Sequence, residues 1–126
     1  EHGGDAIHLN NGQSSPESAS YAEFHYGIRV IGGDAPMGVG GNALQVNGFG
    51  TTAFIYGGTF LGGEGSNGDN GLSLYVLNSA TAHVRGGMFR GDMTVERHGQ
   101  IRFYGCFMKV GTRVTGEFAD ESELDV

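Results

Sequence analysis

Residues 28–34 read IRVIGGD, a short run in which apolar and polar side chains alternate before a pair of glycines. Related runs occur at residues 54–60 (FIYGGTF), 83–89 (HVRGGMF) and 102–107 (RFYGCF). A second phrase precedes each of them, at residues 5–12 (DAIHLNNG), 42–50 (NALQVNGFG), 72–79 (LSLYVLNS) and 93–99 (MTVERHG). Two phrases that recur in the same order indicate one repeated structural unit, which is typical of a solenoid.

Alternation assigns each residue of these runs to one of two faces, because successive side chains of a strand point to opposite sides. We align Ile28 with Ala53, Ala82 and Ile101, and Val30 with Ile55, Val84 and Phe103. In the second phrase we align Ile7, Leu44, Leu72 and Met93, and then Leu9, Val46, Leu74 and Val95. These positions are expected to form inward apolar ladders, together with an aromatic column of Phe60, Phe89 and Phe107.

The repeat predicts an all-β fold, a short parallel β-helix of about four coils in a single domain spanning residues 1–126. We place the coils at residues 5–33, 42–60, 72–89 and 93–107, followed by a closing segment at 112–126 in which Leu124 and Val126 face the core. The inserts at residues 13–27, 34–41 and 61–71 are rich in glycine and serine and are expected to be surface loops. The strict left-handed hexapeptide pattern is missing, so right-handed coiling is expected.

The composition argues against several fold classes and against one class of partner. Glycine accounts for 25 of 126 residues without a three-residue period, which excludes collagen, and the recurring apolar residues argue against disorder. No stretch of about 18 apolar residues occurs, so no membrane span is expected. The net charge of −7 argues against nucleic acid as a partner. The lone Cys106 cannot form an internal disulfide and is expected to pack as a small apolar residue.

The outward positions of the main phrase form the candidate ligand-binding face. Parallel strands stack about 4.8 Å apart, so matched outward side chains form a flat surface. Aromatic rings can stack on sugars, and arginine forks can grip carboxylate or sulfate, so this face suits a polysaccharide, an acidic one above all. The alternative is that the rings and arginines stack on one another and only shield the sheet. The candidate residues are Arg29, Phe54, Tyr56, His83, Arg85, Arg102 and Tyr104.

The sequence contains few motifs that indicate metal binding or catalysis. No cofactor is expected and no histidine pair has metal-ligand spacing; residues 62–67 (GGEGSN) match only part of a calcium-binding repeat, so Glu64, Asn67 and Asp69 are at most a weak calcium site. No nucleophile signature or P-loop is present, and no catalytic residue is assigned. A lyase or epimerase that uses His83, Arg85, Arg102 and Tyr104 is the third alternative, although the stack is short for a sugar-binding groove.

Residues 81–95 (TAHVRGGMFRGDMTV) and the ending at residues 111–126 (GTRVTGEFADESELDV) resemble glycine-rich β-solenoid repeats of secreted and cell-surface proteins. Such repeats occur in bacterial proteins with PEP-CTERM sorting tails and in algal extracellular proteins. Their closing pattern is matched here by Val114, Gly116, Asp120, Leu124 and Val126, with Glu121 where glycine is usual. The resemblance covers residues 42–126 and implies an extracellular or cell-surface setting and a non-enzymatic role.

The sequence therefore favours an extracellular structural or adhesive solenoid that is not an enzyme. Neither end has an amphipathic helical cap, and open strand edges predict head-to-tail stacking of the chain with itself, or further repeats of a longer chain. A module that binds acidic polysaccharide through the candidate face is the main alternative.

Overall fold

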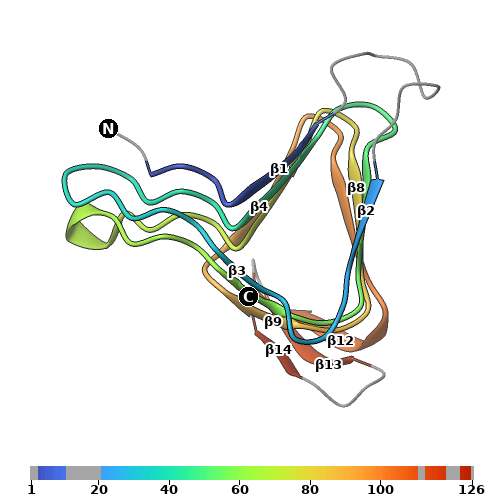
Figure 1. Ribbon diagram of the computed structural model, residues 1–126. Helices are drawn as coiled ribbons and strands as arrows, with labels where there is room; N and C mark the ends of the chain where they lie inside the picture. The colour runs from blue at the N-terminus through green and yellow to red at the C-terminus, as the bar shows by residue number, and fades with distance from the viewer. Residues whose placement is uncertain (1–2, 11–20, 111–112, 119–122, 126) are drawn as a thin grey trace.

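The computed structural model describes residues 3–10, 21–110, 113–118 and 123–125. Within these residues it is all-β apart from the 3-10 turn η2 (Ser66–Gly68), and its strands stack into three parallel sheets that form the sides of a triangle (Figure 1). This confirms the predicted class and is compatible with a β-helix or solenoid. The first sheet contains β1 (Ile7–Asn10), β4 (Leu44–Asn47), β7 (Leu74–Leu77) and β10 (Met93–Glu96). The second contains β2 (Tyr21–Phe24), β5 (Thr52–Ile55), β8 (Thr81–Val84) and β11 (Gln100–Phe103), and the third β3 (Arg29–Ile31), β6 (Thr59–Leu61) and β9 (Met88–Arg90).

The core lies inside the triangle and consists of apolar ladders. Ile55 of β5 pairs with Val84 of β8, and both side chains are fully buried, as the alternation predicts. On the third sheet the rings of Phe60 and Phe89 stack at a centroid distance of 5.1 Å with an interplanar angle of 10°. Phe24 packs edge-on against Phe60 at a centroid distance of 5.6 Å and covers the end of this aromatic stack next to the first strands. Stacked inward side chains therefore hold the three sheets together.

The alignment of the opening phrase was wrong. Residues 29–31 form β3 and pair with β6, so Val30 lies opposite Phe60 rather than in the column of Ile55. The true partner of β5 is β2, within the insert 13–27 that we expected to be a loop, and there Phe24 pairs with Ile55. Ile28, expected to point inward, is 37% exposed. Two neighbouring runs both alternate and both precede a glycine, and a period of two cannot say which one joins which sheet.

The third copy of the second phrase was misaligned by two residues. Leu74 and Val76, not Leu72 and Leu74, pair with Leu44 and Val46 of β4. A shift of two keeps the side chains within β7 on their predicted faces, so Leu74 stays inward, whereas Leu72 lies before the strand and is only half-buried.

The last part of the chain departs furthest from the prediction. After β11 the chain does not add a strand to the third sheet but forms an antiparallel sheet of β12 (Gly105–Val110), β13 (Arg113–Phe118) and β14 (Glu123–Asp125). The residue opposite Phe107 is Gly116 of β13, so Phe107 does not extend the column of Phe60 and Phe89. Instead Phe118, 3% exposed, joins the core. Leu124 pairs with Gly116, and Val126 lies outside the described residues.

A glycine-rich arm projects from the corner between the third and first sheets (Figure 1). We define the glycine arm as residues 3–6, 32–42 and 62–72, which run side by side. Backbone N–H groups and carbonyls join it in a continuous series with N–O distances of 2.8 Å, from Gly71 to Gly63, Gly41, Gly33 and Gly4. The inserts 34–41 and 61–71, expected to be surface loops, are thus an ordered backbone array.

The array needs glycine because its backbones almost touch. A Cβ added at Gly63 would lie 2.1 Å from the Gly33 carbonyl oxygen, and one at Gly41 would lie 2.2 Å from that of Gly4. No side chain fits at such distances.

Side chains that follow glycine pairs tie the segments of the arm to one another. Asp5 Oδ1 accepts from the Asn42 N–H at 2.9 Å, and Asn42 Oδ1 accepts from the Leu72 N–H at 2.8 Å. Asp34 Oδ1 accepts from the Glu64 N–H at 2.8 Å in the same manner. The repeated pattern Gly-Gly-Asp or Gly-Gly-Asn is therefore a backbone clamp that passes from one segment to the next.

Candidate functional site

Six of the seven residues predicted for the ligand-binding face lie together on the second sheet. Phe54, His83 and Arg102 share one outward column on β5, β8 and β11. Tyr56, Arg85 and Tyr104 follow directly after the same three strands. Arg29 does not belong to this group, because it pairs with Thr59 on the third sheet. We call the group of six the aromatic–arginine face.

Its first column is a continuous ring stack. Phe54 and His83 stack at 5.1 Å with an interplanar angle of 8°, and Tyr21 meets Phe54 edge-on at 6.1 Å. On its other side His83 packs against Tyr104 at 5.8 Å with a tilt of 33°. Ring faces in this stack are therefore covered by neighbouring rings.

The second column is also paired internally. Tyr56 stacks on His25 at 5.0 Å, and the Arg85 guanidinium lies 4.3 Å from the centroid of the Tyr104 ring. A hydrogen bond of 2.7 Å joins His83 Nδ1 and the Tyr104 hydroxyl. The predicted alternative, in which rings and arginine stack on one another, describes these contacts. Few ring faces are left for a sugar.

The electrostatics of the face are set by its arginines. Burial lowers the pKa of His83 below its ordinary value of 6.5, and the charges of Arg102 and Arg85 lower it further. The imidazole is therefore neutral at pH 7. Both arginines are exposed, and within the described part of the chain neither forms an ion pair. Two exposed cations without a carboxylate partner can hold an anion.

Sequence reasoning missed Tyr21, Glu23 and His25, which complete this face at β2. Glu23 lies opposite Phe54, so the column ends in an acid where Arg29 was expected. The signal was present, since YAEF repeats the pattern of TAFI and TAHV with an alanine at the second position. Aligning that alanine, rather than the glycine turn, finds the correct partner.

The weak calcium candidate lies at the outer part of the glycine arm. Glu64, Asn67 and Asp69 are all exposed, and Asn67 adopts a left-handed turn with φ of 53°. The Asp69 carbonyl accepts from the Gly40 N–H, which fixes the turn against the preceding arm segment. Among the residues that the structure describes, no group of three His, Cys, Asp or Glu side chains could hold a metal ion.

Two further observations concern the chain beyond this face. Within the described ranges no helix is long and apolar enough to cross a membrane. Comparison with protein-family models, with curated proteins and with solved structures finds no match to this chain.

Proposed function

We propose that the chain is a structural or adhesive β-solenoid of the extracellular space or cell surface, not an enzyme, that associates with copies of itself or with a matrix. In this proposal the three sheets belong to a right-handed coil of about four turns. The internal stacking of the aromatic–arginine face supports it, because rings that pack on one another stiffen the scaffold and leave few ring faces for a substrate.

The observation that carries the proposal is the open edge of β10 and β11. Each is the last strand of its sheet, with one described neighbour. The Ser73 N–H bonds to the Asp92 carbonyl and the Gln100 N–H to the Ala80 carbonyl. Because hydrogen bonding alternates along a parallel strand, the N–H groups of Val95 and Ile101 point away from β7 and β8. Such groups are a template for another strand.

The side chains at this edge are also only partly covered. Val95 is 45% exposed, whereas its register partner Val76 in the preceding strand is fully buried. Met93 and Ile101 are half-buried as well, although they continue apolar ladders. An apolar ladder that ends exposed beside unpaired backbone favours addition of a further strand from a second molecule.

Sedimentation velocity across a concentration series tests this directly. The wild-type chain is expected to sediment faster as concentration rises. Val95→Pro removes the outward N–H without breaking the bonds to β7, and it should reduce association strongly. Val95→Ala keeps the N–H and is the matched control, and it should weaken association much less than Val95→Pro. A wild-type monomer at every concentration would overturn self-association through this edge.

A second candidate function is binding of acidic polysaccharide. One observation favours it: Arg85 and Arg102 are exposed and form no ion pair within the described chain, on the same face beside a neutral imidazole. Because the ring faces are occupied, binding would rest on the guanidinium groups and not on sugar stacking.

The test is retention on immobilised heparin and polygalacturonate at low salt. The double change Arg85→Gln and Arg102→Gln should remove retention. Arg29→Gln with Arg90→Gln takes the same charge from the third sheet and should leave it nearly intact. Equal loss in both pairs would mean that only net charge matters, and absence of wild-type retention would remove this candidate.

A further inference from the structure

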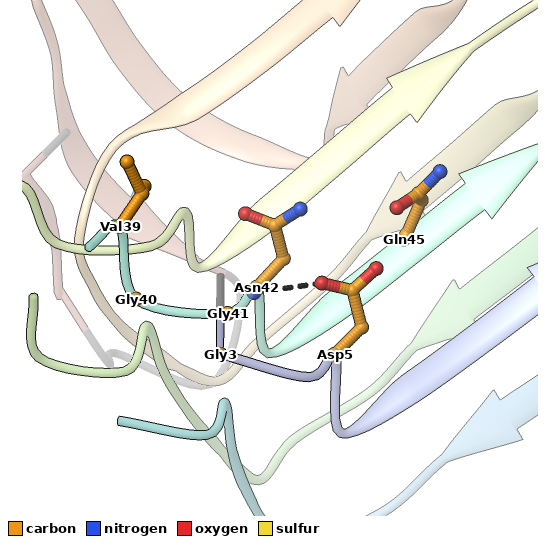
Figure 2. A pocket seen from close by; sticks show the side chains of 7 residues that line it. All are labelled: Gly3, Asp5, Val39, Gly40, Gly41, Asn42 and Gln45. Carbon is orange, nitrogen blue, oxygen red and sulfur yellow. Dashed lines mark hydrogen bonds between the residues drawn. The ribbon is translucent and has the colours of Figure 1, made fainter. Parts of the chain in front are cut away.

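A hollow of about 430 Å³ lies where the glycine arm meets the first sheet, away from the aromatic–arginine face (Figure 2). Asp5 enters it from the segment before β1, Asn42 from the end of the arm segment before β4, and Gln45 from β4 itself. Val39 of the arm forms its apolar side, and the bare backbone of Gly41 contributes to its wall. The volume falls within the range of about 300–1,000 Å³ typical of small-molecule sites.

The polar groups of the hollow are held in place by bonds that leave part of each group available. Asp5 spends Oδ1 on the Asn42 N–H, while its second oxygen points toward the side where Gln45 lies (Figure 2). Asn42 spends Oδ1 on the Leu72 N–H, which leaves its amide NH2 as a donor. The half-buried Gln45 adds one amide donor and one acceptor. A preorganised set of one carboxylate oxygen and two amides results.

The chemistry of this set selects the class of ligand. Among the described residues that line the hollow none is basic, so an anion would meet only the charge of Asp5. A calcium ion needs about six to eight oxygen ligands, and one carboxylate with two amides falls short of that. A flat aromatic ligand would find only Val39 as an apolar partner. A carboxylate oxygen and amides instead match adjacent hydroxyl groups, which donate to the first and exchange bonds with the second.

We propose that this hollow binds a neutral sugar residue through a pair of adjacent hydroxyls, with Asp5 as acceptor and Asn42 and Gln45 as amide partners. Val39 packs against the C–H groups of the ring. The site is independent of the strand edge and of the arginines, so it stands whether or not the proposed function does.

The test follows amide signals of the ¹⁵N-labelled full chain while glucose, galactose and mannose are added separately. At least one sugar should shift the signals of Gly41, Gln45 and the Asn42 side chain in a saturable manner. Inorganic sulfate and free glucuronate should not.

Matched variants separate recognition from folding. Asp5→Asn keeps an oxygen for the Asn42 N–H but loses the charged acceptor, and it should weaken binding about tenfold or more. Asp34→Asn makes the same change at the equivalent clamp outside the hollow and should bind as wild type. Gln45→Ala should also weaken binding without loss of the folded spectrum. No saturable shift with any of the three sugars, or equal weakening by Asp34→Asn, would overturn the proposal.

Discussion

The three-sheet core and the glycine arm are ordered by opposite means. In the core, large side chains such as Phe60 and Phe89 fill the space between strands and exclude water. In the arm, Gly41 and Gly63 have no side chain, and order comes from backbone hydrogen bonds at contact distance. Removing side-chain atoms should therefore destabilise the core, whereas adding side-chain atoms should destabilise the arm.

The largest effect should come from emptying the core. Phe60 is fully buried between Phe24 and Phe89, so Phe60→Ala should destabilise the chain by about 3–5 kcal/mol. Denaturant unfolding followed by circular dichroism measures it. Phe49→Ala is the control, because Phe49 is 47% exposed and should cost much less. Similar losses for both would mean that the core ladder does not hold the fold.

The converse change belongs to the arm. Gly63→Ala places a Cβ 2.1 Å from the Gly33 carbonyl oxygen, so the two arm segments must move apart. We expect this to destabilise the arm by about 1–3 kcal/mol or more. Hydrogen exchange should rise in residues 32–42 and 62–72 while Ile55 and Val84 stay protected. Gly4→Ala, with nothing within 4 Å of its new Cβ, should change little. If the core loses protection together with the arm, the two regions are one cooperative unit and the comparison fails.

A smaller effect is expected at the clamp that joins two segments of the arm. Asp34→Ala removes the bond to the Glu64 N–H, which should cost about 0.5–1.5 kcal/mol. Asp34→Asn retains the acceptor oxygen and should restore most of the loss. Faster amide exchange at Glu64 in the alanine variant alone is the expected signature, and identical exchange in both variants would argue against the clamp.

The smallest effect concerns protonation of His83. Its folded pKa lies below the ordinary value of 6.5, so the unfolded chain binds the proton more tightly. The contribution of His83 to stability should be fully present above pH 6.5 and should be lost as pH drops from there through the folded pKa of His83. NMR titration of the ring measures the pKa, and His83→Gln should flatten this part of the stability profile. A titration of His83 above 6.5 would contradict the account.

The core was predictable from the sequence to the extent that periodicity alone decides it. Ile55 and Val84 point inward in any register that moves by two residues, so alternation was enough. The strand register was not predictable for the same reason. The wrong register assigned Arg29 to the ligand-binding face and left out Tyr21 and His25. The arm was missed because glycine-rich sequence is typical of loops, while its order depends on distances between backbones that composition does not encode.

The hollow could not be found in the sequence at all. Asp5 and Gln45 are brought together because β1 pairs with β4, and the arm adds Val39 and Gly41 beside them. The repeated Gly-Gly-Asp and Gly-Gly-Asn pattern was a visible signal for the clamp, yet it says nothing of the space left beside it. Distant pairing created this site, and local patterning did not.

Concentration-dependent hydrogen exchange at the open edge tests the proposed function most directly. The N–H groups of Val95 and Ile101 point away from β7 and β8 and should exchange rapidly in dilute solution. At high concentration they should become protected, while amides inside the ladders, such as that of Val84, should not change. Exchange at Val95 and Ile101 that stays fast at every concentration would contradict association through this edge.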